Sequence, residues 1–96
     1  MSYELSEAAF EDYLELYAQG VARFGGMQAI AYSDSLEQTF ELIAANPKMA
    51  RLRTELAPPV RVHPHGSHLV VYVERDDRIV ILRIRHAREN WLDRPT

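Results

Sequence analysis

Residues 68–85 read HLVVYVERDDRIVILRIR, two apolar runs with a period of two on either side of the pair Asp76-Asp77. Such alternation is typical of β-strands, and the polar pair predicts a hairpin turn, either of two residues or slightly wider and centred on the same pair. With Glu74 placed opposite Ile79, the register collects aliphatic side chains on one face of the hairpin. We expect helices to pack on that face, because it is the more apolar one. Its members are Leu69, Val71, Val73, Val80, Leu82 and Ile84.

The opposite face of this hairpin combines apolar and basic side chains. Alternation gives it Val70, Tyr72, Ile81, His68, Arg83 and Arg85, and a further strand over residues 60–63 adds Arg61 and His63. No predicted helix covers this face, so we expect either a binding partner or the segment over residues 88–92 to close it. Trp91 is the natural anchor in both cases.

Two stretches of helical periodicity precede the hairpin. Ser6 is the predicted N-cap of the first helix, Gly25-Gly26 ends it, and the second helix ends near Asn46 because Pro47 follows. We expect both apolar stripes to face the core. The first stripe is Phe10, Tyr13, Leu14, Tyr17, Val21 and Phe24, and the second is Ala29, Tyr32, Leu36, Phe40 and Ile43.

Shorter features complete the predicted architecture. Residues 3–5 alternate like an edge strand, and residues 47–59 form a connector with a helical turn near residues 49–52. Gly20 marks either an early helix end or a close approach by another element. The sequence therefore predicts one domain over residues 1–96 of the α+β class, in which a short strand and a helical hairpin pack on one face of a small antiparallel sheet.

Composition excludes several classes of protein. Hydrophobic residues make up 47% and charged residues 26% of the 96 residues, which is typical of a globular chain and not of a disordered one. The absence of cysteine excludes a disulfide framework, a thiolate metal site and a cysteine nucleophile. No apolar run reaches the roughly 18 to 20 residues that span a bilayer, and the acidic start lacks the basic flank of a signal peptide. We expect a soluble cytoplasmic protein that does not bind membranes.

Charge is divided unequally along the chain. Residues 1–46 hold eight acidic residues and one basic residue, whereas residues 47–96 hold ten basic residues, six acidic residues and all four histidines. A solvated acidic face explains this division, and a basic end also suits an acidic partner or a phosphate backbone.

The usual enzyme signatures are absent, namely a glycine-rich phosphate loop, a Gly-x-Ser-x-Gly elbow and a His-Glu-x-x-His helix. The nearest metal motif is His63-x-His65-x-x-His68, but we favour solvated turn histidines over zinc and expect no metal or other cofactor. Clustered arginines beside a histidine suit RNA cleavage, with guanidinium groups on the phosphate and an imidazole moving a proton. The competing interpretation is that these arginines bind acidic residues of a protein partner or keep the sheet face solvated.

The order of three motifs resembles the ParE branch of the RelE/ParE toxins over residues 3–91. The motifs are Tyr3-x-Leu5-Ser6-x-x-Ala9, a helix pair that ends in Asn46-Pro47, and the terminal run from Ile79 to His86 followed by Arg88. The resemblance implies a bacterial type II toxin that poisons DNA gyrase and is neutralised by a ParD-like antitoxin. It implies a binding protein without sequence-specific contacts to nucleic acid.

The resemblance also implies where partners bind. A sheet face that mixes apolar and basic residues suits an acidic amphipathic helix of the antitoxin. The alternative is a ribosome-dependent mRNA endonuclease of the RelE type, in which Arg61, Arg83 and His86 would be catalytic; the gyrase poison has no catalytic residue. The expected antitoxin contacts are Arg61, Val70, Tyr72, Ile81, Arg83 and Arg85, and the expected target contacts are His86, Arg88 and Trp91.

Overall fold

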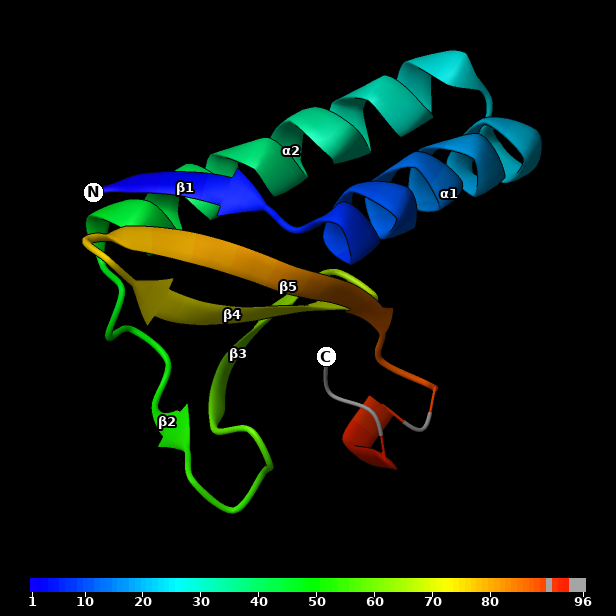
Figure 1. The fold of residues 1–96 in the computed structure, drawn as a ribbon. Helices are drawn as coiled ribbons and strands as arrows, with labels where there is room; N and C mark the ends of the chain where they lie inside the picture. Colours follow the sequence, from blue (N-terminus) through cyan, green and yellow to red (C-terminus); the bar gives the residue numbers. More distant parts are fainter. Residues whose placement is uncertain (90, 94–96) are drawn as a thin grey trace.

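Two helices cover one face of a five-stranded sheet in the computed structural model, which describes residues 1–89 and 91–93 (Figure 1). In chain order the elements are β1 (Ser2–Leu5), α1 (Glu7–Phe24), α2 (Gly26–Ala45), β2 (Leu52–Arg53), β3 (Val60–His65), β4 (His68–Arg75), β5 (Arg78–His86) and the 3-10 helix η1 (Trp91–Asp93). The strand order is β1-β5-β4-β3-β2, with β1 parallel to β5 and the other neighbours antiparallel. The predicted α+β class and the predicted edge strand are confirmed. In the described residues, neither helix has the length and apolar character that a membrane span requires.

Both helices end where the sequence predicts. The Ser6 hydroxyl caps α1 by accepting a backbone N–H bond of 3.0 Å, and Gly25 (φ 91°) ends it. Asn46 is the C-cap of α2. Gly20 does not end α1: a Cβ placed there would lie 3.3 Å from the Ala29 Cβ, so this glycine lets the two helices approach closely.

Tight turns join the three long strands. The hairpin turn lies at Asp76-Asp77 as predicted, and it is the two-residue alternative: the φ angles of 52° and 62° are those of a type I′ turn. The other turn is shorter than predicted. The sequence predicts a turn over residues 64–67, but β3 extends to His65, so only Gly66 and Ser67 connect it to β4. The helical turn predicted near residues 49–52 is wrong, since residues 49–50 form a bend and Leu52 begins β2, which pairs with β3.

A β-bulge shifts the pairing of β4 with β5. The predicted register holds from the turn as far as Tyr72 opposite Ile81, and the next pair omits Leu82. One extra residue changes the alternation beyond it. As a result Ile84 joins the same core cluster as Ile81, whereas the sequence placed them on opposite faces.

The helices cover the face opposite to the predicted one. Val70, Tyr72 and Ile81 are fully buried in the main core, together with Leu36 and Phe40 of α2. Apolarity alone favours the other face. The face that carries Tyr72 can nevertheless be buried, because the Tyr72 hydroxyl donates a 2.8 Å hydrogen bond to the Pro47 carbonyl in the connector. Of the six aliphatic residues predicted to face the helices, Ile84 does so; Leu69, Val71, Val73 and Leu82 belong to a second cluster and Val80 pairs with Val73.

The second cluster closes the other face of the sheet. Its buried members are Val60, Val62, Val71 and Trp91, and β2 and η1 lie on this side, away from the helices (Figure 1). Trp91 exposes only 8% of its surface, and the Arg53 guanidinium lies 5.5 Å from the centre of its ring. Trp91 therefore packs inside the chain, as one of the two predicted alternatives had it, but it covers the sheet face of Val71 and not the face of Val70, Tyr72 and Ile81 where it was expected.

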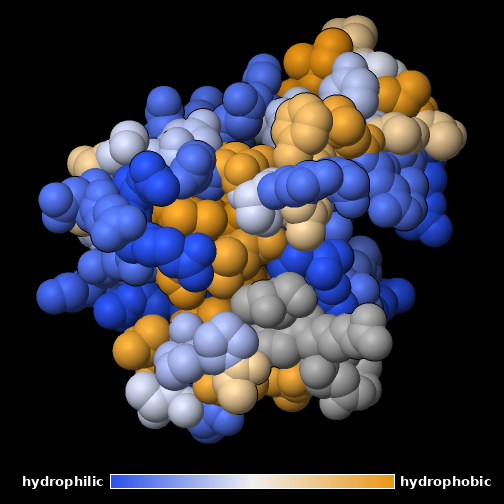
Figure 2. Space-filling view, viewed as in Figure 1, coloured by the Kyte–Doolittle hydropathy of each residue, from blue (hydrophilic) through white to orange (hydrophobic). Residues whose placement is uncertain are grey.

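The two predicted helical stripes differ in burial. The stripe of α2 is buried as predicted, apart from the half-buried Tyr32. The prediction for α1 is wrong, because Ala9 is its only buried residue and most of its large apolar side chains point to solvent. α1 packs beside the part of β5 that extends beyond β1, and it turns Ala9, Asp12 and Leu16 toward the core there. Figure 2 shows apolar surface at the tip of the hairpin, where α1 passes into α2.

Candidate functional site

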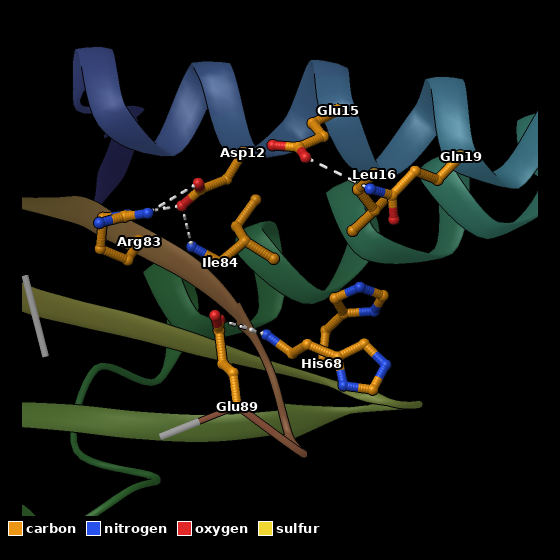
Figure 3. Close-up of a pocket in the computed structure, with 9 residues that line it drawn as sticks. Asp12, Glu15, Leu16, Gln19, His68, Arg83, Ile84 and Glu89 are labelled. Carbon is orange, nitrogen blue, oxygen red and sulfur yellow. Dashed lines mark hydrogen bonds and ion pairs between the residues drawn. The ribbon is translucent and has the colours of Figure 1, made fainter. Parts of the chain in front are cut away.

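A polar cleft of about 230 Å³ lies between α1 and the ends of β4 and β5 (Figure 3). It brings together Arg83 and His86, two of the three residues expected in the nuclease alternative. Arg61, the third, does not line it. The lining residues are Asp12, Glu15, Leu16, Gln19, His68, Arg83, Ile84, His86 and Glu89.

Asp12 of α1 binds Arg83 through two hydrogen bonds, and the side chains point at each other in Figure 3. The Arg83 Nε and Nη2 atoms donate to Oδ2 and Oδ1 at 2.7 and 2.9 Å, and the Ile84 N–H donates to Oδ2 at 3.0 Å. Because the pairing of β1 stops at Ile81, the carboxylate takes the place of a neighbouring strand for that N–H. The hydrogen bonds that Arg83 donates to Asp12 raise the pKa of Arg83. This arginine is held by α1 and is not free to bind a phosphate.

The other two arginines of the predicted interface are also held within the chain. The Arg61 Nη1 atom donates to the Ala50 carbonyl at 2.6 Å, and its Nε atom lies 3.9 Å from a Glu74 carboxylate oxygen. The Arg85 Nε atom lies 3.0 Å from Glu89 Oε1, close enough for an ion pair although its N–H is not directed at that oxygen. Both side chains are mostly buried, with 15% and 13% exposed.

Two histidines join the β3–β4 turn to α2. The His65 ring lies between the Ser35 and Thr39 hydroxyls, at 3.0 and 2.8 Å, while the Tyr32 hydroxyl donates to the His65 carbonyl and lies 2.8 Å from His68 Nδ1. Burial is the main cause that lowers the pKa of both His65 and His68, so both rings are neutral near pH 7. Across residues 1–89 and 91–93, no three His, Cys, Asp or Glu side chains form a group suited to a metal ion.

His68 and His86 meet at the cleft with their ring centres 5.3 Å apart. The Tyr32 hydroxyl already donates to a carbonyl, so it accepts from His68 Nδ1 and leaves Nε2 of that ring unprotonated. His86 Nδ1 accepts the Arg88 N–H at 3.1 Å, which leaves the proton on its Nε2. One ring thus presents a hydrogen-bond acceptor to the cleft and the other a donor.

The predicted interface residues are separated by the structure. Three expected antitoxin contacts are fully buried under the helices, so the surface assigned to them does not exist; they are Val70, Tyr72 and Ile81. Among the expected target contacts, His86 and Arg88 are exposed and Trp91 is inside the second cluster. Sequence reasoning missed Asp12, whose only signal is a carboxylate on the side of α1 that carries Ala9.

An apolar surface lies instead on the outside of the helical hairpin. We call this surface the hairpin stripe. It consists of Phe10 (53% exposed), Leu14 (51%), Val21 (41%), Phe24 (63%), Met27 (90%) and Ile30 (50%). Contiguous apolar exposure of this kind marks interaction sites on small proteins.

Comparison with known proteins places these features in a family. The family model described as the ParE toxin of type II toxin-antitoxin system, parDE, matches residues 3–91. Toxin ParE1 of Caulobacter vibrioides is 33% identical over 88 residues, covering 92% of this chain and 91% of the relative. Toxin ParE1 of Mycobacterium tuberculosis is 33% identical over 87 residues, covering 90% and 89%. A solved structure titled "Chromosomal ParDE TA system from P. aeruginosa" has a TM-score of 0.76 over 90% of this chain and 95% of that one, and at 19% identity this likeness concerns the fold.

Proposed function

Because the chain belongs to the ParE toxin family of type II toxin–antitoxin systems, we propose that it stops bacterial growth by binding DNA gyrase in the cytoplasm and that a ParD-like antitoxin neutralises it. The toxin acts through protein contacts and has no catalytic residue. His86 and Arg88, exposed beside the cleft, are the proposed contacts with gyrase.

One observation favours a binding protein over an mRNA endonuclease: the arginines that a nuclease needs are already paired. A scissile phosphate requires free cationic donors that reach its oxygens, ideally in pairs. Arg83 donates to Asp12 instead, and Arg61 donates to a backbone carbonyl. The cleft that holds His86 also carries the carboxylates of Glu15 and Glu89, which repel a phosphate.

Expression of the toxin alone tests its target. We expect growth arrest with accumulated covalent gyrase–DNA complexes, and linear DNA when purified toxin is mixed with gyrase and supercoiled plasmid. The exposed variant Glu55→Gln, in the connector, is the matched control and should arrest growth equally. Arrest with transcripts cut on ribosomes contradicts the gyrase proposal and supports the RelE-type alternative. Normal growth contradicts both.

Co-expression with the protein encoded beside it tests the antitoxin. We expect growth to recover and the two proteins to purify as one complex. A neighbouring protein that neither binds the toxin nor restores growth would refute this half of the proposal.

A further inference from the structure

We propose that the hairpin stripe binds an amphipathic helix of the antitoxin whose flanking side chains are basic. This inference rests on the proposed function, because it assigns a surface and a charge to the partner named there. It differs from the sequence-based expectation in both respects, since that expectation placed an acidic helix on the sheet.

The spacing of the stripe fits a helical partner. Phe10, Leu14, Val21 and Phe24 follow one another at intervals of four, seven and three residues, which keeps them on one side of α1. They extend over 14 residues, or about 21 Å at 1.5 Å per residue, the length of a helix of roughly four turns. An apolar row of this length is the usual docking surface for an amphipathic helix.

Among the described residues, the stripe contributes little to the packing of the fold, since each of its members is at least 41% exposed. The side of α1 that meets the sheet and α2 consists of other residues, among them Ala9, Asp12, Tyr13 and Gly20. Large apolar side chains at regular helical spacing lose the benefit of burial when they are left in water. Such a pattern is therefore explained by a surface that another protein covers.

Carboxylates border the stripe on both sides. Glu7 and Glu11 follow the stripe around α1, toward solvent. On α2 the row Ile30, Asp34, Glu37 and Glu41 has the same helical spacing, and its direction is given by the Tyr13 hydroxyl, which donates to Glu37 Oε2 at 3.0 Å. Within residues 1–89 and 91–92, none of these five carboxylates forms an ion pair.

Basic residues are almost absent from the same region. α2 contains none, and Arg23 is the only one in α1. An acidic helix on the stripe would meet like charge along both edges, whereas a helix with Lys or Arg flanks would meet opposite charge. The sign of the border therefore selects a basic partner helix.

Asp34 is the best position to test the border. The contacts Tyr13–Glu37 and Gly20–Ala29 define how the antiparallel helices lie beside each other, and they place Asp34 level with the middle of the stripe. Its charge also raises the pKa of Tyr13, although burial of that hydroxyl is the larger cause.

The experiment measures binding of the cognate antitoxin to toxin variants by calorimetry or surface plasmon resonance. The double variant Leu14→Asp/Val21→Asp should raise Kd by about 100-fold or more, and Met49→Asp, at a similarly exposed apolar residue of the connector, should leave it unchanged. Circular dichroism confirms that each variant is folded. For the wild type, raising NaCl from about 50 to about 500 mM should weaken binding, because opposite charges attract less when screened.

A matched pair of charge variants isolates the border. Asp34→Lys should weaken binding at low salt and make it less salt-dependent, whereas Glu55→Lys, the same change of charge on the connector, should do neither.

Equal antitoxin binding by the Leu14→Asp/Val21→Asp variant would overturn the surface and leave the toxin function intact. Loss of growth arrest with retained antitoxin binding would also overturn it, because the stripe would then contact the target. Affinity that rises with salt would overturn the basic partner, and a wild type that neither arrests growth nor binds the antitoxin would refute the proposed function itself.

Discussion

Asp12 stabilises the junction of α1 and β5 with a single carboxylate. It accepts two hydrogen bonds from the Arg83 guanidinium and one from the Ile84 N–H, and the paired side chains are only 15% and 24% exposed. Removing one partner of a largely buried ion pair leaves the other charge poorly solvated, which is why such pairs are costly to break. Exposed pairs contribute much less.

Substitution of Asp12 therefore tests the stability that this junction supplies. We expect Asp12→Ala to lower the free energy of unfolding by about 2–3 kcal/mol, since it strands a guanidinium and a backbone N–H together. Glu4→Ala breaks the exposed Glu4–Arg78 pair and should cost less than about 1 kcal/mol. Urea denaturation of both variants gives the comparison, and equal losses would contradict the role assigned to Asp12.

The neutral histidines make stability depend on pH. Burial lowers the pKa of His65 and His68 below the usual 6.5, so the unfolded chain takes up protons at a higher pH than the folded protein does. Their contribution is complete above about pH 6.5 and declines as the pH falls through the lower folded pKa values. We expect Tm to drop between about pH 7.5 and pH 5, and to drop less in His65→Gln/His68→Gln. The same pH slope in the double variant would show that other groups cause it.

The contact between the two helices depends on the absence of a side chain at Gly20. A Cβ at this position would already lie 3.3 Å from the Ala29 Cβ, and a branched side chain would have to push α1 and α2 apart. The same contact explains why a helix former is missing from the middle of α1, although glycine there costs about 1 kcal/mol of helix propensity.

Enlarging this residue should weaken the hairpin. We expect Gly20→Val to destabilise the protein by about 1–3 kcal/mol and Gly20→Val/Ala29→Gly to recover part of the loss, because the second change returns space to the contact. Gly26→Ala is the control: a Cβ there meets no atom within 4 Å, and the change should be neutral or stabilising. Thermal denaturation of the wild type and the three variants measures these differences in stability. If the double variant recovered no stability, a local steric cause would be contradicted.

The whole molecule is a sheet with a core on each side. The helices bury one face of the sheet. On the other face, Trp91 of η1 packs in a cluster with Val60, Val62 and Val71. Segments more than 20 residues apart in sequence meet in this second core, as the Arg53 guanidinium over the Trp91 ring illustrates. A 96-residue chain has little apolar surface to spare, so both cores contribute to its stability.

Trp91 reports directly on the second core, because it is the only tryptophan in the chain. Its fluorescence should be blue-shifted and protected from acrylamide in the native protein, and should shift to the red on unfolding. Trp91→Ala should destabilise the protein by about 3–5 kcal/mol. Leu92→Ala, at the exposed neighbour, is the matched control and should have a small effect. A native spectrum like that of exposed tryptophan would contradict the burial of this side chain.

The helix ends and the hairpin turn could be predicted from the sequence alone. Ser6, Gly25 and Asn46 marked the helix ends, and Asp76-Asp77 marked the hairpin turn. These features depend on neighbouring residues alone, through capping, positive φ and proline chemistry. Together with the strand pattern they were sufficient for the fold class.

Which face of each strand and helix is buried could be seen only in the tertiary structure. A period of two defines two faces of a strand, and a helical stripe defines one side of a helix, but neither pattern says which side another segment covers. Here a bulge at Leu82 changes the alternation of β5. The Tyr72 hydroxyl finds a hydrogen-bond acceptor in a carbonyl 25 residues away. The side of α1 that carries Asp12, and not its apolar stripe, faces β5. Secondary structure followed from the sequence because short-range interactions specify it, and the family was indicated by the resemblance in the order of three motifs. The faces that are buried, and hence the surface left for a partner, were decided by contacts between residues far apart in the chain.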